Sequence, residues 1–453
     1  MNSYTTIYSL RLTIWTIVGA VVLAGCQQKV KPVLVQASVT EEDRLMDQLQ
    51  QQCLDYIWKG GEEQSGAARE RIHTDGDYPQ DDSDVVTSGG TGFGIMAIVA
   101  GIERKFIDRD SAVARLEQLV SWLEKADRWH GVWPHWMYPS GKTKPFSRFD
   151  DGGDLVETAY LAQGLITARQ YFATGNAREK ALAAKMNKLW EEIDWNFYTK
   201  GKDVLYWHWS PNVGWQMNFA VKGYNECLIM YILAASSKTH GIKAEVYHKG
   251  FMRNGEIVTD KVYYGLPTVL DHFDSDDKAV GPLFWAHYSY LGLNPKGLKD
   301  KYANFWDLNR NHALIHYRHC SENPNGYKGY SDECWGLTSS YSMVGYAGHC
   351  PQEDLGVISP TAALSSFPYT PEESMKFLKF LYLKHPEIVG KYGPYDAFSF
   401  QSDWMKPHYL AIDQLPIVSM VENYRSGLLW KLFMSAPEIQ AGLKKLEFTS
   451  FQQ

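Results

Sequence analysis

The chain has 453 residues, and 45 Lys and Arg stand against 52 Asp and Glu, which gives a net charge of −7 at pH 7. This balance excludes the basic surface with which proteins bind nucleic acid, so we expect no such partner. Aromatic residues make up 14% of the chain, more than packing alone requires, and this excess fits a cleft that stacks against sugar rings.

The N-terminus predicts export. Arg11 precedes an apolar run, residues 12–22, that is shorter than a membrane span and typical of a signal peptide. The run leads to Leu23-Ala-Gly-Cys26, which resembles the bacterial lipobox, whose cysteine is lipidated. We therefore expect a signal peptide over 1–25, a tether over 26–40 and a single monomeric domain over 41–453. A lipid on Cys26 would hold the protein at the cell envelope, either on the periplasmic side or at the outer surface. The alternative is an ordinary signal peptide.

Two kinds of helix follow in chain order. Charged residues confined to one face predict amphipathic helices at 40–58, 108–127, 177–194, 371–383 and 436–448. Segments that are apolar nearly all round predict buried helices, which begin near Thr87, Asp151, Lys222, Trp335, Ser359 and Ile412. Strand patterns occur only at 203–209 and 254–264, as short hairpins.

Buried helices interleaved with amphipathic ones predict an all-α fold, an (α/α)6 toroid with a few short strands in its loops. The region 240–310 fits least well, and Gly281 opens an alternative inner helix there. In such a toroid the N-termini of the inner helices converge on one funnel.

The segment Phe149-Asp-Asp-Gly-Gly-Asp-Leu-Val-Glu157 begins one of the buried helices. If the helix starts near Asp151, then Asp150, Asp154 and Glu157 line one face. Burying three acids costs desolvation energy, so they are rarely kept there for packing alone. Paired carboxylates hydrolyse glycosidic bonds: one protonates the leaving oxygen, and another activates water or attacks the sugar. A solvated helix start or a calcium loop are the alternatives.

Further acids stand near the other predicted helix starts. Glu226 lies among apolar residues and is the predicted general acid, with Asp154, Glu157 or Asp413 as the base. A structural pair of Glu226 with Lys222 is the alternative. Other acids expected at the funnel are Asp396 and Asp403, and the predicted substrate-binding residues are Asp150, Trp133, Trp136, Trp209, Trp215, Glu333 and Tyr341.

Three of the six cysteines lie near histidines, in His316-Tyr-Arg-His319-Cys320, at Cys334 and in His349-Cys350. The spacing matches no standard zinc site, so we expect a disulfide within 320–350 or buried thiols, and no metal or other cofactor.

Six long motifs stand in order between about residues 45 and 445: Thr87-Ser-Gly-Gly-Thr-Gly-Phe, Arg148-Phe-Asp-Asp-Gly-Gly-Asp-Leu-Val-Glu-Thr-Ala, Gly223-Tyr-Asn-Glu226, Cys334-Trp-Gly-Leu-Thr, Ile358-Ser-Pro-Thr-Ala-Ala and Ile412-Asp-Gln-Leu-Pro. Together they resemble the "putative glucoamylase" domain of bacterial lipoproteins, a group that includes the endo-β-1,2-glucanases of glycoside hydrolase family 144. The resemblance implies an (α/α)6 barrel and inverting cleavage of linear β-1,2-glucan to sophorose and short oligosaccharides. It places essential acids at Asp154, Glu157 and Glu226, with Asp150 beside them.

Two positions depart from the family pattern. Tyr341 stands where the family usually has an acid, and Leu415 replaces a glycine, so the chain-length preference stays open. A polysaccharide lyase or exo-glucosidase on the same toroid and a non-catalytic glycan-binding lipoprotein are the alternative functions. The β-1,2 linkage rests on the resemblance alone.

Overall fold

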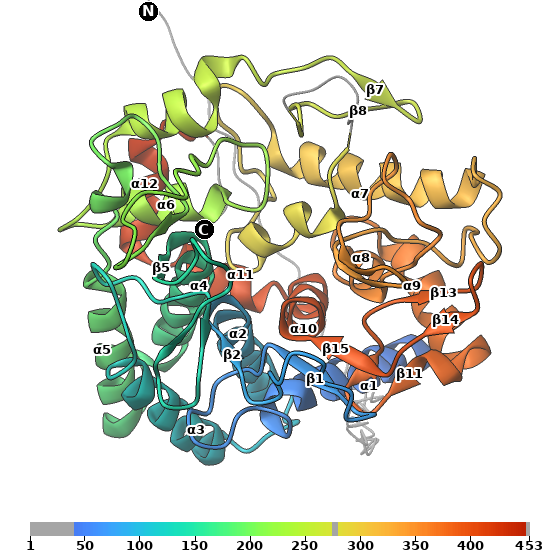
Figure 1. Ribbon diagram of the computed structural model, residues 1–453, viewed down its shortest axis with the longest axis horizontal. Helices are drawn as coiled ribbons and strands as arrows, with labels where there is room; N and C mark the ends of the chain where they lie inside the picture. Colours follow the sequence, from blue (N-terminus) through green and yellow to red (C-terminus); the bar gives the residue numbers. More distant parts are fainter. Residues whose placement is uncertain (1–39, 274–279, 450–453) are drawn as a thin grey trace, which may run out of the picture. The chain divides into compact units, whose positions relative to one another are not determined.

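The computed structural model describes residues 40–273 and 280–449. The chain divides into two units, 1–40 and 41–453, and the second holds nearly all the described residues. Cys26, the predicted lipidation site, lies outside them. The second unit is mostly helical, with short strand pairs between the helices, as the sequence predicts at this level of detail (Figure 1).

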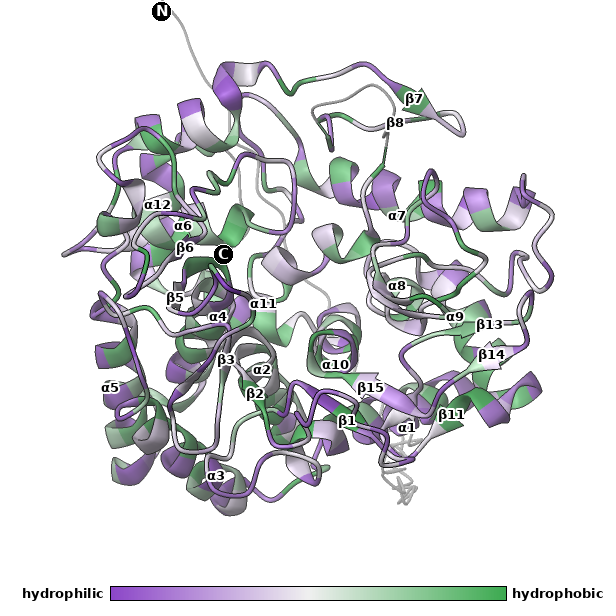
Figure 2. Ribbon diagram, in the orientation of Figure 1, coloured by the Kyte–Doolittle hydropathy of each residue, from purple (hydrophilic) through white to green (hydrophobic). Residues whose placement is uncertain are grey.

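Five helices are buried on nearly all sides, as expected for segments that are apolar all round. They are α2 (Ser88–Glu103), α4 (Leu155–Phe172), α6 (Leu228–Ser236), α8 (Pro360–Leu364) and α10 (Ala411–Arg425). Six others bury one face, and Figure 2 shows hydrophilic and hydrophobic residues mixed along α5 and α7. These are α1 (Glu41–Trp58), α3 (Arg109–Leu123), α5 (Ala177–Glu191), α7 (Phe305–Glu322), α9 (Pro371–Lys379) and α12 (Pro437–Lys445), and a short α11 (Leu428–Met434) precedes α12.

Each buried helix packs against a one-sided helix: α2 against α3, α4 against α5, α6 against α12, α8 against α9, and α10 against α1. A sixth pair joins α7 to the 3₁₀ turn η4 (Leu283–Ala286), which η5 (Tyr288–Tyr290) follows. The five predicted amphipathic helices are confirmed, and α7 is an addition that the sequence patterns did not predict.

One predicted inner helix is wrong. The residues after Trp335 form no helix, because Gly336 has a φ of +121° and Leu337 O accepts a hydrogen bond from Leu283 N, as in extended chain. The place in the sixth pair belongs instead to the turns that follow Gly281, the alternative start.

The strands form antiparallel pairs of two or three residues. Three of them run directly into buried helices and so fix the positions of the helix N-termini: β2 (Val86–Thr87) into α2, β5 (Gly153–Asp154) into α4 and β15 (His408–Leu410) into α10. Their partners are β3 (Trp136–Met137), which also pairs with β4 (Thr143–Lys144), β6 (His208–Trp209) and β1 (Arg71–His73). The remaining pairs are β7 (Val262–Tyr263) with β8 (Leu266–Pro267), β9 (Ser340–Ser342) with β10 (Gly345–Ala347), β11 (Val389–Gly390) with β12 (Gly393–Pro394), and β13 (Phe398–Ser399) with β14 (Trp404–Met405).

The two predicted hairpins have different outcomes. The pattern at 254–264 contributes β7 to a hairpin with β8. The pattern at 203–209 contains β6, but β6 pairs with β5, more than fifty residues earlier in the chain, and not within a hairpin. This pairing brings His208 opposite Asp154.

Helices α2 and α4 approach each other closely because both carry glycine at the contact. A Cβ on Gly92 would lie 2.2 Å from the carbonyl oxygen of Tyr160, and one on Gly164 would lie 2.2 Å from that of Gly92. The close approach brings the first turn of α4, which carries Glu157, against the first turn of α2. In residues 40–273 and 280–449, no helix has both the length and the apolar character that a membrane span requires.

Candidate active site

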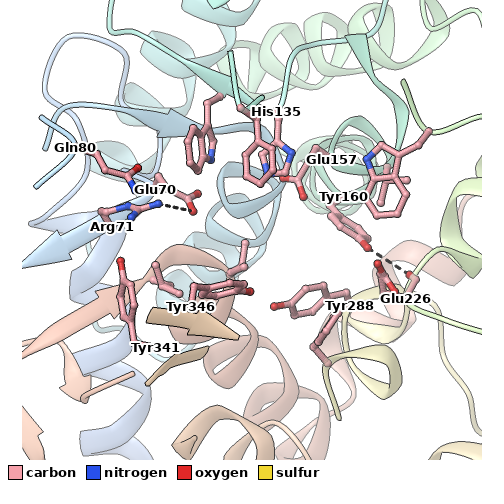
Figure 3. A pocket seen from close by; sticks show the side chains of 17 residues that line it. Glu70, Arg71, Gln80, His135, Glu157, Tyr160, Glu226, Tyr288, Tyr341 and Tyr346 are labelled. Carbon is pink, nitrogen blue, oxygen red and sulfur yellow. Dashed lines mark hydrogen bonds and ion pairs between the residues drawn. The ribbon is translucent and has the colours of Figure 1, made fainter. Parts of the chain in front are cut away.

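A cavity of about 390 Å³ opens at the N-terminal ends of the buried helices (Figure 3). Its wall combines carboxylates with aromatic rings, the composition of a sugar-binding cleft. The lining residues are Glu70, Arg71, Gln80, His135, Trp136, Phe146, Val156, Glu157, Tyr160, Trp207, Glu226, Phe284, Tyr288, Tyr341, Tyr346, Leu410 and Ile412.

Glu157 lies in the first turn of α4 and reaches the cavity. Its Oε2 accepts hydrogen bonds from Gly89 N at 2.9 Å and from Thr87 Oγ1 at 3.4 Å. A Cβ on Gly89 would lie 2.3 Å from this oxygen, so only glycine leaves room for the contact. Burial raises the pKa of Glu157 to about 7, although the nearby His135 opposes the shift.

Asp154 is the N-cap of α4 and does not line the cavity. Its Oδ1 accepts from Val156 N and Glu157 N, both at 2.9 Å, and its Oδ2 accepts from the indole Nε1 of Trp207, also at 2.9 Å. The helix therefore begins at Leu155 and not near Asp151, so the three acids do not share a helical face as predicted. With both oxygens engaged, Asp154 positions its neighbours and is poorly placed to activate water.

His135 links two of the predicted acids. Its Nδ1 lies 3.1 Å from Asp154 Oδ2 and 3.6 Å from Asp150 Oδ2. Burial by itself would lower the pKa of His135. The carboxylates of Glu157, Asp150 and Asp154 outweigh this effect and raise the pKa well above its usual value. Ligand atoms of His135, Asp150 and Asp154 lie within 4.8 Å of one another, close enough for a metal ion. The hydrogen bonds that already occupy Asp154 fit a protonated imidazole at the centre of this group better than a cation.

Glu226 stands just before α6, at the opposite end of the cavity from Arg71 (Figure 3). Its backbone carbonyl accepts from Ser289 Oγ at 2.5 Å and from Tyr160 OH at 3.5 Å, which fixes the main chain. Its carboxyl group receives no hydrogen bond from any other described residue, and Lys222 is exposed and forms no ion pair with it. Burial raises the pKa of Glu226 to about 7.

A second, more open hollow of about 340 Å³ adjoins the cavity on the far side of Glu226. Trp207, Glu226 and Phe284 line both spaces. The second hollow adds further aromatic side chains, Phe219, Phe273 and Trp285. Glu226 therefore lies at the boundary between two spaces that can each hold a sugar.

The other end of the cavity is formed by charged and phenolic groups from β1 and β9. Arg71 Nε lies 3.1 Å from Asp82 Oδ2, and its Nη2 lies 3.8 Å from Glu70 Oε1. Tyr341 OH lies 3.0 Å from His73 Nε2. Tyr341 also lines the cavity, and its predicted contact with substrate stays a prediction.

Asp413 does not reach the cavity. It is buried in α10 against Asp396, whose Oδ2 accepts from Tyr341 N at 2.8 Å. Burial raises the pKa of Asp396 to about 6 and, together with the charge of Asp396, holds the pKa of Asp413 well above its usual value. This arrangement contradicts a direct role for Asp413 as base.

Of the other predicted contacts, Trp136 lines the cavity and Asp150 lies behind it, 3.3 Å from His208 Nε2. Trp133 is fully buried, and its indole donates to Leu123 O, so the structure contradicts a sugar contact there. Trp209 and Trp215 pack around Phe197 away from the cavity. Glu333 pairs with Lys384 at 2.6 Å, and Asp403 lines a separate surface hollow.

Sequence reasoning missed Glu70, Arg71, Tyr160 and Tyr288. Glu70 and Arg71 carried one usable signal, since they end a run of three charged residues, 69–71, in a short segment between predicted helices. Cys320 and Cys334 are buried thiols, the second of the two outcomes expected for them.

Residues 218–437 match the family described as "Putative glucoamylase". An endo-β-1,2-glucanase from Chitinophaga pinensis, solved with sophorotriose and glucose, is 58% identical, with a TM-score of 0.89 over 91% of this chain and 99% of that one. The chain belongs to this family of glycoside hydrolases, and the resemblance seen in the sequence is confirmed. A member from Bacteroides caccae, described as a putative glucoamylase, is 55% identical, with a TM-score of 0.89 over 90% of this chain and all of that one.

A curated relative from Parabacteroides distasonis, an exo β-1,2-glucooligosaccharide sophorohydrolase acting at the non-reducing end, is 41% identical over 430 residues. The match includes 90% of this chain but 58% of that protein, so the chain spans a little over half the length of this relative.

Proposed function

We propose that this glycoside hydrolase cleaves linear β-1,2-glucan at internal bonds, and that its helix pairs close into an (α/α)6 toroid. The observation that carries endo action is the place of Glu226 between two aromatic-lined spaces. A general acid at such a boundary lets the chain continue on both sides of the bond that breaks. The linkage is supported by the relatives from Chitinophaga pinensis and Parabacteroides distasonis, both named for β-1,2-glucans or their oligosaccharides.

The environments of the two cavity glutamates support different roles for them. Both have a pKa raised to about 7 by burial, but the charged forms are stabilised unequally. Glu157 accepts from Gly89 N and lies near the protonated His135, which favour its carboxylate. Glu226 has no such partner among the described residues, so no comparable contact favours its charged form. Glu226 therefore acts as the general acid and Glu157 as the group that activates water, the division of an inverting enzyme.

A digest across linear glucans tests the proposal. The protein should release soluble sugars from β-1,2-glucan and none from β-1,3- or β-1,4-glucan, and early products should span many lengths. Release of sophorose alone from the first minutes would point to exo action, as in the Parabacteroides distasonis relative. Products with absorbance near 235 nm would indicate a lyase, and binding without any product would indicate a glycan-binding protein.

We further propose that the protein is a lipid-anchored component of the bacterial cell envelope. The support is the run over residues 12–22 followed by Leu23-Ala-Gly-Cys26. A glycan-degrading domain at the end of a short tether suits an enzyme that meets its polymer outside the cytoplasm.

A further inference from the structure

Three buried histidines outside the cavity hold one peptide unit, that of Gly281. His312 Nε2 and His316 Nε2, one turn apart on α7, lie 2.7 and 2.9 Å from Gly281 O. The amide N–H of Gly281 donates to His272 Nδ1 at 2.9 Å. Burial lowers the pKa of all three rings, to about 4 for His312, so they are neutral near pH 7. Two therefore act as donors and one as an acceptor.

The second nitrogen of each ring makes no contact of this kind within the part of the chain that the structure describes. His272 Nε2, His312 Nδ1 and His316 Nδ1 are buried without a hydrogen-bond partner among the described residues. A buried polar nitrogen without a partner costs free energy, and an apolar side chain would fill the same space without that cost. The contact that explains these rings is the one with Gly281.

Gly281 begins the segment that separates the two sugar-sized spaces. Phe284 lines both spaces, and Trp285 lines the second hollow. Gly281 itself has no room for a side chain, since a Cβ would lie 2.4 Å from the Trp285 ring. Further along, Phe284 N donates to Thr338 Oγ1 at 3.1 Å. The histidines therefore hold one end of the segment 281–285, and Thr338 holds its middle.

We propose that His272, His312 and His316 are positioning residues that set the wall of Phe284 and Trp285 for the sugar unit beyond Glu226. The inference rests on the proposed function. Trp285 packs against Gly281 and lines the second hollow but not the central cavity, whereas Phe284 lines both. Loss of the histidine contacts therefore weakens substrates that extend past Glu226 more than those that end there. This selective effect distinguishes a positioning role from a general structural one.

Paired variants separate the hydrogen bonds from the bulk of the rings. His272→Leu and His312→Leu remove the bonds to Gly281. His272→Asn keeps an acceptor near the position of Nδ1, and His312→Gln keeps a donor near that of Nε2. His319→Leu is the matched control, because His319 is also a buried residue of α7 but bonds to Asp354 at 2.8 Å and to Tyr264 and not to the wall.

Two substrates report on the two spaces: long β-1,2-glucan, and β-sophorosyl fluoride, whose small leaving group ends at Glu226. The ratio of their kcat/KM values is independent of the fraction of folded protein. Each Leu variant should lower this ratio about tenfold, equivalent to about 1.4 kcal/mol, one hydrogen bond to a buried carbonyl or amide. The Asn, Gln and His319→Leu variants should keep it within about twofold.

An unchanged ratio in both Leu variants, with wild-type protein active on the glucan, would overturn this inference alone. An equal fall in the His319→Leu control would do so too, since it would show a general effect of lost packing. A wild-type protein that cleaves no β-1,2-glucan would instead reject the proposed function, and this inference with it.

Discussion

Replacing Glu226 with glutamine should make the protein more stable at alkaline pH while removing its activity. The pKa of Glu226 is raised from 4.5 to about 7 in the folded protein by burial. Between these values the folded protein holds a proton that the unfolded chain releases. Stability therefore falls as pH rises through this window, and the full penalty is present above about pH 7. Glutamine stays neutral at every pH and avoids the penalty.

The size of the gain follows from the same shift. At 1.36 kcal/mol for each pH unit, the penalty grows by about 2.5 kcal/mol between pH 5 and pH 8. The carboxyl group faces an open cavity, and water there screens the charge, so we expect the variant to gain about 1 to 2.5 kcal/mol over this range. Loss of the general acid should lower kcat by about 10²- to 10⁴-fold.

Urea unfolding of Glu226→Gln and wild type at pH 5, 6.5 and 8 measures the gain directly. Glu333→Gln is the matched control, because Glu333 is a partly exposed carboxylate paired with Lys384 at 2.6 Å, and it should show no such pH-dependent gain. If the difference in unfolding free energy between Glu226→Gln and wild type is the same at pH 5 and pH 8, Glu226 is not held protonated by burial. The acid assignment would then lose its physical basis.

Three further predictions follow from the site and its surroundings. The pH profile of kcat/KM should be a narrow bell centred near pH 7, because Glu226 must be protonated and Glu157 ionised, and both have a pKa of about 7. The alkaline limb of the profile should disappear in Glu226→Gln when the substrate has a fluoride leaving group. A flat profile from pH 5 to 9 would contradict these two roles. Arg104→Met should destabilise the fold by about 3 kcal/mol with kcat unchanged, because it leaves the buried Glu422 without its counter-charge. Arg104 binds Glu422 at 2.6 and 3.0 Å. A decrease in the unfolding free energy of less than about 1 kcal/mol, measured by denaturant unfolding, would show that the pair contributes little. Cys26→Ser should abolish acyl labelling and release active protein from the membrane fraction, and unchanged partitioning after fractionation would reject the lipid anchor.

Much of the helical framework could be predicted from the sequence because helix periodicity is local. The apolar run after Leu155 and the one-sided charges of 177–194 each specify a helix through neighbours three or four residues apart. The same holds for the acids at the start of α4, since a capping aspartate and a first-turn glutamate belong to one short segment. Local patterns also placed Glu226 at the start of a buried helix.

Tertiary structure alone decided how these acids are used. Asp154 gives its oxygens to Trp207 and the helix N-terminus because β6 pairs with β5, a contact between distant segments. Glu70 and Arg71 reach the cavity because β1 pairs with β15, more than three hundred residues later. The sixth inner position went to the turns after Gly281, held by histidines from α7, because hydrogen bonds between distant segments, and not local periodicity, determine that part of the chain. Side-chain periodicity thus specified the helices, and pairing across long sequence separations determined which groups face the sugar.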